Sequence, residues 1–206
     1  MKLMLTILLL ALSMPSLSSQ RAITDTGDEV ILNDDGTWEL DKNNTATSIT
    51  ENKEIFIKPK KSSFLLKSKK NKSAYWINTN KWTFKKATNN PDAEYELQLK
   101  NGDLYGMTIS EEIEIDLEEL ANLAISIAKG SAPDLKVVTK EYRIVNGKKV
   151  IFMEMRGTLQ GIKFTYLGYY FSDKSGSTQL VTYTETNLVN KYKKDVFDLL
   201  NGLVTY

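Results

Sequence analysis

The sequence predicts an α+β protein in which an antiparallel β-sheet is flanked by helices. Three observations support this fold class. Turn sequences divide residues 141–186 into four segments rich in β-forming residues. Residues 116–129 and 187–201 have the apolar spacing and the end signals of two amphipathic helices. The strands do not alternate regularly with helices, as they would in a doubly wound parallel sheet.

The N-terminal residues have the organisation of a secretory signal peptide. Lys2 supplies a short positive region, Leu3–Met14 is apolar, and Ser16 and Ser18 occupy the small-residue positions of a cleavage site. An uncleaved anchor is disfavoured because a membrane-spanning helix needs about 20 apolar residues. We therefore expect residues 1–18 to be a signal peptide. The mature chain would then be exported, periplasmic or extracellular, and without a transmembrane segment.

Residues 19–41 predict a small β-hairpin unit ahead of the main domain. We expect strands at Ala22–Thr24, Glu29–Leu32 and Thr37–Leu40, because turn-forming residues separate these segments. So few short strands are only marginally stable alone. Asn33, Asp34, Asp35 and Glu39 carry oxygen atoms that could bind calcium, but their spacing is not that of a helix-loop-helix calcium site. A turn in the chain explains these residues without a metal.

Residues 42–72 are predicted to be a polar, lysine-rich linker. Seven lysines and no acidic residue lie between Lys58 and Lys72. The favoured interpretation is a solvated segment whose charges repel one another, because no helical amphipathicity accompanies the charge. The alternative is a module that binds an anionic surface through the Lys58–Lys72 tract.

The main domain is expected to cover residues 73–206. Tyr75–Ile77 is its first predicted strand, and Glu94–Lys100 alternates apolar with polar residues, as a strand with one solvated face does. A hairpin at Asn101-Gly102 then leads into Leu104–Ser110.

The two helices of the main domain have recognisable end signals. Asp116 is a predicted N-cap with Glu119 in the capping-box position, and Gly130 is expected to end this helix in the left-handed conformation. Asn187 is expected to cap the second helix, and Gly202 to end it.

Residues 141–186 form the centre of the predicted sheet. Asn146-Gly147 and Gln160-Gly161 favour two-residue hairpin turns, which need positive φ at both central residues. A third turn is expected in Ser172–Ser177. The strand Ile162–Phe171 is therefore expected in the middle of an antiparallel sheet.

From Trp76 to the C-terminus, the chain resembles the PsbP-like α/β/α sandwich group. Several segments carry the resemblance together: the Tyr75-Trp76 strand leading to Trp82, the helix ending in Gly130–Asp134, Val145–Val150, Gly161–Tyr166 and the terminal amphipathic helix. The chain is also similar to small exported bacterial proteins of unassigned function, in which a unit like Asp34–Trp38 precedes such a domain. The resemblance implies an accessory, assembly or envelope-support role, with no family catalytic motif.

The composition excludes several reaction classes. The chain has no histidine and no cysteine, so it cannot contain a histidine base, a cysteine nucleophile, a zinc-thiolate site or a disulfide. The formal net charge of +1 gives no general attraction for nucleic acid. No glycine-rich phosphate loop is recognisable. We therefore predict no cofactor, no metal and no enzymatic activity.

Glu154 and Arg156 are the first pair of candidate ligand-binding residues. They lie two positions apart, on the strand face that also carries Val150 and Phe152. A carboxylate beside a guanidinium on an otherwise apolar face could hold a polar ligand or act as an acid/base pair. A structural ion pair at the rim of the sheet explains the same residues.

Tyr166, Tyr170 and Tyr183 are the remaining candidate ligand-binding residues. Tyrosine has an apolar body and a polar tip, which suits both pockets and interfaces. Cross-strand packing in a sheet explains the same residues without a ligand.

The sequence supports three functional hypotheses. The first is a non-enzymatic, exported accessory protein of the bacterial cell envelope, whose partner is an envelope protein or a small ligand. The second is an enzyme that uses carboxylate and tyrosine chemistry around Glu154, Arg156 and Tyr166. The third is the anionic-surface-binding module described for the Lys58–Lys72 tract.

Overall fold

The computed structural model describes residues 20–23, 29–40, 49–88 and 90–206. The chain divides into two units between Thr47 and Ser48, and each unit is described by itself. The predicted signal peptide, residues 1–18, lies outside the described residues.

The N-terminal unit contains a three-stranded antiparallel sheet in the order β1-β2-β3. Its strands are β1 (Gln20–Ile23), β2 (Glu29–Leu32) and β3 (Trp38–Leu40). The turn between β2 and β3 is closed by side chains. The Asp35 carboxylate accepts hydrogen bonds from the Thr37 amide at 2.9 Å and from the Thr37 hydroxyl at 2.6 Å, while Gly36 takes the positive φ of 81° that the turn requires.

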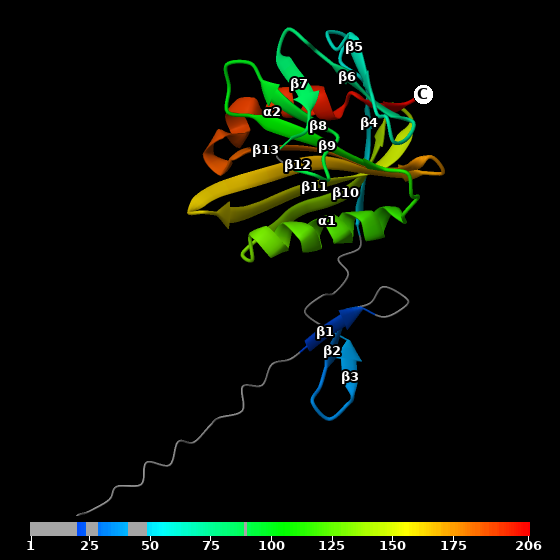
Figure 1. Ribbon diagram of the computed structural model, residues 1–206, viewed down its shortest axis with the longest axis vertical. Helices are drawn as coiled ribbons and strands as arrows, with labels where there is room; N and C mark the ends of the chain where they lie inside the picture. Colours follow the sequence, from blue (N-terminus) through cyan, green and yellow to red (C-terminus); the bar gives the residue numbers. More distant parts are fainter. Residues whose placement is uncertain (1–19, 24–28, 41–48, 89) are drawn as a thin grey trace, which may run out of the picture. The chain divides into compact units, whose positions relative to one another are not determined.

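The main unit is built on an eight-stranded sheet, which Figure 1 shows between two helices. Neighbouring strands are antiparallel except for β4 and β10, which are parallel. In spatial order the strands are β4 (Thr50–Phe56), β10 (Lys136–Val145), β11 (Lys148–Leu159), β12 (Ile162–Asp173), β13 (Gly176–Glu185), β9 (Tyr105–Glu111), β8 (Tyr95–Leu99) and β7 (Trp82–Lys86). As predicted, β12 lies in the interior of the sheet.

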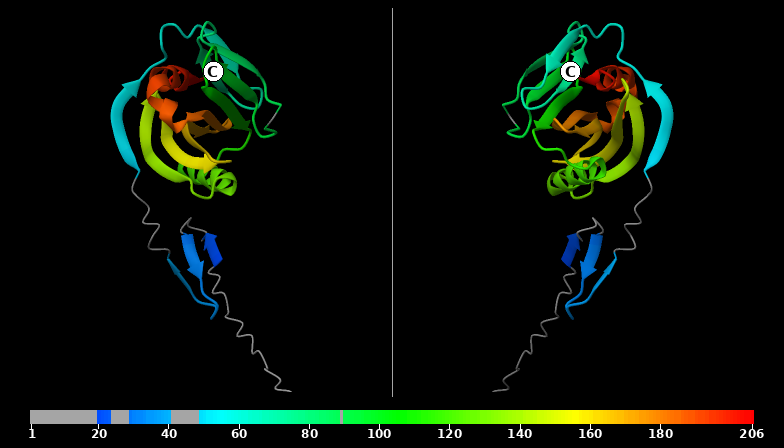
Figure 2. Two further views of the ribbon diagram at one scale, coloured as in Figure 1. Left: turned by 90° about the vertical axis from the view of Figure 1, so that its left-hand side faces the viewer. Right: turned by 90° about the vertical axis from the view of Figure 1, so that its right-hand side faces the viewer.

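The sheet curves around α2 (Val189–Leu200), as Figure 2 shows, and we call this side the inner face. The inner face is also covered by a small sheet of β14 (Leu203–Thr205), β6 (Ser73–Ile77) and β5 (Phe64–Lys67). The opposite, outer face carries α1 (Leu117–Ser131), which packs on β11 and β12. The α+β class predicted from the sequence is confirmed.

The central meander follows its predicted turns. Asn146 and Gly147 have φ values of 48° and 78°, and Gln160 and Gly161 have values of 50° and 82°. Two-residue turns with positive φ match the twist of the strands that they join. They also fix the register, so that Met155 on β11 lies opposite Tyr166 on β12.

Two buried clusters occupy the two faces of the sheet because successive side chains of a strand alternate. Val150 and Phe152 on β11 belong to the inner cluster with α2, whereas Ile151 and Met153 belong to the outer cluster with α1. The strands β11, β12 and β13 are therefore apolar on both faces.

The helix ends differ in part from the predictions. The Asp116 carboxylate caps α1 by accepting hydrogen bonds from the amides of Glu118 and Glu119, as expected. The prediction that Gly130 ends α1 is wrong. The helix continues to Ser131, because Gly130 keeps a negative φ and only the approach of Pro133 stops further helical hydrogen bonding. The expected Asn187 cap is also wrong, since that residue lies in the 3-10 turn Thr186–Leu188 and makes no capping bond.

The predicted linker, residues 42–72, is wrong for the part that the structure describes, which contains β4 and β5. β4 is an edge strand with a mostly exposed surface, so its polar sequence resembles that of a linker. Several lysines of the tract make defined contacts. Lys70 pairs with Glu111 at 2.9 Å, and the Lys67 ammonium lies 4.1 Å from the centre of the Tyr206 ring.

Candidate functional site

The outer face of the large sheet contains two adjoining cavities. The first, which we call the helix cavity, has a volume of about 400 Å³ and lies between α1 and the sheet. The second, which we call the open cavity, has a volume of about 460 Å³ and lies over strands β7, β8, β9 and β13. Asn90 and Met107 line both cavities, so the two are neighbours.

The helix cavity is mainly apolar. Its roof is one side of α1, and its floor is the outer face of β9, β11, β12 and β13. The apolar residues that line it are Met107, Ile109, Leu123, Ala124, Ile127, Ala128, Ala132, Met155, Leu159, Phe164 and Val181. Leu123 and Ile127 remain 47% and 61% exposed, so α1 does not close the cavity on that side.

Among the polar side chains of the helix cavity that are not exposed, three lack a hydrogen-bond partner within the part of the chain that the structure describes. They are Tyr166, Tyr170 and Gln179, and none of them makes a side-chain hydrogen bond there. Tyr170 and Gln179 lie directly opposite each other on β12 and β13. Tyr170 is only 1% exposed as a residue, yet its unpartnered hydroxyl is not among the fully enclosed polar atoms, so it borders the accessible space of the cavity.

Three tyrosines of the outer face, Tyr166, Tyr170 and Tyr183, are neutral at ordinary pH. Burial raises the pKa of Tyr166, Tyr170 and Tyr183 above the usual value of 10.0. Each hydroxyl therefore keeps its proton and can donate a hydrogen bond. A protonated phenol is a poor base and a poor nucleophile, so these groups are suited to binding rather than to acid/base chemistry.

An aromatic row crosses the outer face from β12 to β9. It consists of Phe164, Tyr166, Tyr183 and Tyr105. Successive ring centres along the row are 4.7, 5.8 and 5.6 Å apart, in edge-on and stacked arrangements. These separations are typical of favourable aromatic contacts. The row joins the helix cavity to the open cavity, because Tyr166 lines the first and Tyr183 lines the second.

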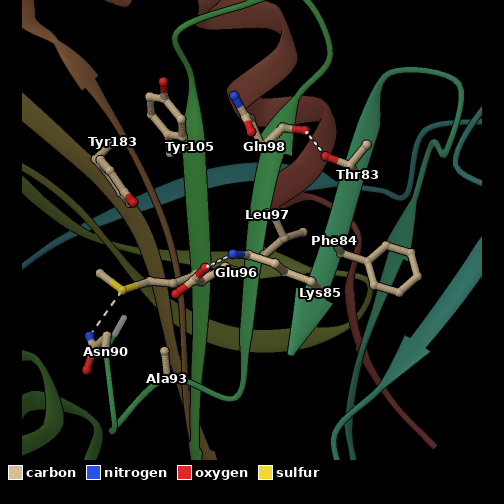
Figure 3. A pocket seen from close by; sticks show the side chains of 11 residues that line it. Thr83, Phe84, Lys85, Asn90, Ala93, Glu96, Leu97, Gln98, Tyr105 and Tyr183 are labelled. Carbon is tan, nitrogen blue, oxygen red and sulfur yellow. Dashed lines mark hydrogen bonds and ion pairs between the residues drawn. The ribbon is translucent and has the colours of Figure 1, made fainter. Parts of the chain in front are cut away.

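The open cavity is more polar, as Figure 3 shows. The Lys85 ammonium and the Glu96 carboxylate form an ion pair at 3.1 Å across β7 and β8. The Thr83 hydroxyl donates a hydrogen bond to the Gln98 carbonyl at 3.2 Å. The predicted alternation of Glu94–Lys100 is confirmed, since Leu97 and Leu99 are buried in the inner core whereas Gln98 between them is exposed.

Glu154 and Arg156 lie on the inner face, away from both cavities. The Arg156 guanidinium donates to the Glu154 carboxylate at 2.6 and 2.9 Å, which gives a partly exposed ion pair. The predicted grouping of this pair with Tyr166 is wrong. Tyr166 is opposite Met155, so the alternation of side chains directs it to the other face of the sheet. The three residues do not form one cleft.

Sequence reasoning missed several residues of the outer face. Tyr105 and Gln98 belong to the same cross-strand row as Tyr183, and Gln179 faces Tyr170. Alternation in residues 104–110 places Tyr105 on one face with Met107 and Ile109, which is a usable sequence signal. The pairing of β9 with β13 has no such signal, because 64 residues lie between the end of β9 and the start of β13 in the chain.

A second polar cluster that the sequence did not indicate is centred on Arg143, which is 8% exposed. Its guanidinium donates to Glu141 at 2.6 Å and to the Tyr169 hydroxyl at 3.3 Å, and it lies 3.8 Å from the centre of the Phe152 ring. The Tyr169 hydroxyl donates in turn to Asn201 at 2.8 Å. This network connects β10, β12 and the end of α2. We interpret it as an interaction that stabilises the fold rather than as a binding site.

Other site types find no support in the described residues. None of the acidic side chains described gather in groups of three with the geometry to hold a metal ion. Likewise, no helix in the described ranges has both the length and the apolar character needed to cross a membrane.

Comparisons with known proteins show the fold of this chain. No family model matches it, and no curated protein does so. Cyanobacterial PsbP (CyanoP) from Synechocystis sp. PCC 6803 is similar with a TM-score of 0.55 and 13% identity, over 71% of this chain and 94% of that chain. The PsbP-like fold is therefore confirmed. At this identity, the likeness concerns the fold alone.

Two further solved structures show weaker similarity. One is a protein of unknown function from Pseudomonas aeruginosa described as a putative regulator, with a TM-score of 0.44 and 8% identity over 61% of this chain and 83% of that chain. The other comes from Bacteroides thetaiotaomicron VPI-5482, with a TM-score of 0.41 and 5% identity over 66% of this chain and 45% of that chain. The resemblance of the N-terminal unit to exported bacterial proteins stays a prediction.

Proposed function

We propose that this protein is an exported, non-enzymatic accessory protein of the bacterial cell envelope that binds a small ligand on the outer face of its large sheet. The observation that carries the proposal is the helix cavity. Its volume of about 400 Å³ lies within the usual range for small-molecule pockets, roughly 300–1,000 Å³. Its apolar walls with a few polar groups are also typical of such pockets.

The chemistry of the cavity favours binding over catalysis. Apart from its tyrosines, the ionisable residues that line it are Asp92 and Glu111, and both are exposed. Glu111 is paired with Lys70. No nucleophile next to a base is present among the lining residues, and the tyrosines stay protonated. The signal-like N-terminus supports export.

A fluorescent apolar probe tests the proposal. The uncharged dye N-phenyl-1-naphthylamine should gain fluorescence with the mature protein, residues 19–206, because it enters the helix cavity. Ala128→Trp, on the cavity side of α1, should abolish this gain by filling the space. Ser126→Trp, at an exposed position of the same helix, is the matched control and should leave the signal unchanged.

Two results would overturn the proposal. One is the absence of a fluorescence gain with the wild-type protein. The other is an equal gain with the Ala128→Trp variant, provided that circular dichroism shows it to be folded, since the dye would then bind elsewhere.

A further inference from the structure

We infer that the helix cavity selects an uncharged, mostly apolar molecule that carries a hydrogen-bond-accepting oxygen, such as a hydroxyl or carbonyl group, and that it discriminates against the corresponding carboxylate. This inference rests on the proposed function, because it names the ligand class of the same cavity.

The Tyr170 hydroxyl is the first argument. A polar group in a largely apolar site is usually hydrogen-bonded in native structures, to protein, water or a ligand. Tyr170 is 1% exposed, lines the helix cavity and has no hydrogen-bond partner among the described residues. A phenylalanine would line the cavity equally well if the position served packing alone. A ligand oxygen that accepts its proton would satisfy the hydroxyl.

The polar groups are placed to hold a ligand of defined length. Gln179 lies opposite Tyr170 in the register of β12 and β13, so both side chains project from neighbouring strands on the same face and line the cavity. Tyr166 lies four residues away along β12 on the same face, a separation of about 13 Å for an extended strand. Apolar residues, among them Met155 and Val181, occupy the floor on the neighbouring strands. An elongated molecule that is apolar over most of its length matches this arrangement.

The charged residues around the cavity disfavour the binding of an anionic ligand. None of the residues that line it is a lysine or an arginine. Of the two charged ones, Asp92 is negative and Glu111 already engages the neighbouring Lys70 ammonium, which is therefore not free to pair with a ligand. A carboxylate moved into such a site would lose its hydration without gaining a cation. The protonated tyrosines offer neutral hydrogen bonds, which suffice for a hydroxyl or carbonyl oxygen but not for a full negative charge.

Matched probes test the inference on the mature protein. Decan-1-ol and decanoate have the same chain and differ in their head group, which is ionised in decanoate at about pH 8. We expect decan-1-ol to displace N-phenyl-1-naphthylamine at a concentration at least tenfold lower than decanoate does. Equal displacement, or stronger displacement by decanoate, would overturn the inference. Displacement by neither compound, with the dye still bound, would overturn it and leave the proposed function intact.

Tyr170→Phe separates a ligand-binding hydroxyl from a structural one. This variant should bind decan-1-ol about five- to tenfold more weakly, as expected for one lost hydrogen bond. Its thermal stability without ligand should be unchanged or higher, because the hydroxyl has no protein partner to lose. Tyr95→Phe is the control, since Tyr95 packs against the inner core and does not line the helix cavity. Unchanged decan-1-ol binding by the Tyr170→Phe variant would contradict the inference.

If the wild-type protein does not bind the dye at all, the proposed function fails as well.

Discussion

Tyr183 stacks on Tyr105 with ring centres 5.6 Å apart and ring planes inclined by 22°. The two residues pair across β13 and β9, which are far apart in the chain. This contact joins the meander of residues 136–185 to the β7–β8–β9 side of the sheet, and it continues the aromatic row to the open cavity.

Alanine variants of this pair should be energetically coupled. Tyr105→Ala and Tyr183→Ala should each lower the free energy of unfolding by about 1–2 kcal/mol, and the double variant should lose less than their sum by about 0.5–1 kcal/mol. Urea unfolding followed by circular dichroism would measure all three values. Strict additivity would show that the stacked rings do not stabilise each other.

The Arg143 network should contribute more to stability than the Glu154–Arg156 pair. Arg143→Met should lower the free energy of unfolding by about 2–4 kcal/mol, because it leaves the largely buried Glu141 carboxylate without its cation. Arg156→Met, which removes an arginine that is 48% exposed, should cost at most about 1 kcal/mol. Denaturant unfolding of both variants would compare them, and equal losses would contradict the structural role of Arg143.

Buried tyrosines should make the protein sensitive to alkali. Burial raises the pKa of Tyr170 in the folded state above its ordinary value of 10.0. The stability associated with the neutral phenol is therefore fully present below pH 10.0 and is lost as the pH rises above it, because only the unfolded chain then releases the proton.

The Tyr170→Phe variant gives a direct comparison. Between about pH 10 and 12, its free energy of unfolding should fall less steeply than that of the wild type, by about 1.4 kcal/mol per pH unit. Urea midpoints measured across this range would show the difference. Identical slopes would mean that the Tyr170 phenol ionises as easily in the folded protein as in the unfolded chain.

The lysine tract should not bind membranes. Its lysines lie in or beside ordered strands, and removal of Lys2 with the predicted signal peptide leaves equal numbers of basic and acidic residues. We expect the mature protein not to sediment with phosphatidylglycerol vesicles. Replacing Lys60, Lys61, Lys69 and Lys72 with Gln should change nothing. Vesicle binding by the wild type that this variant loses would instead support the anionic-surface hypothesis.

Much of the main unit was predictable because its signals are local. Two-residue turns with positive φ at Asn146-Gly147 and Gln160-Gly161 fixed three strands and their register. The second turn also sets Met155 opposite Tyr166. The separation of Tyr166 from Glu154 therefore follows from the turn and the alternation of side chains, and the sequence contained enough information to show it.

The remaining features depend on contacts between distant segments. Among the described strands, β4 pairs with β10 alone, about 90 residues later in the chain, and its exposed surface removes the apolar alternation by which a strand is recognised. The helix cavity depends on where α1 lies on the sheet and on which strand follows β13. No local pattern around Gln179 or Tyr105 contains that information.

The polar character of β4 has a consequence for the behaviour of the protein at high concentration. β4 is the last strand at one side of the large sheet, so its outer backbone groups have no further strand to pair with among the described residues. Glu51, Lys53 and Glu54 are exposed on it. Charged side chains on an edge strand oppose the addition of a strand from another molecule. The same composition that resembles a linker in the sequence thus protects the folded protein against edge-to-edge polymerisation.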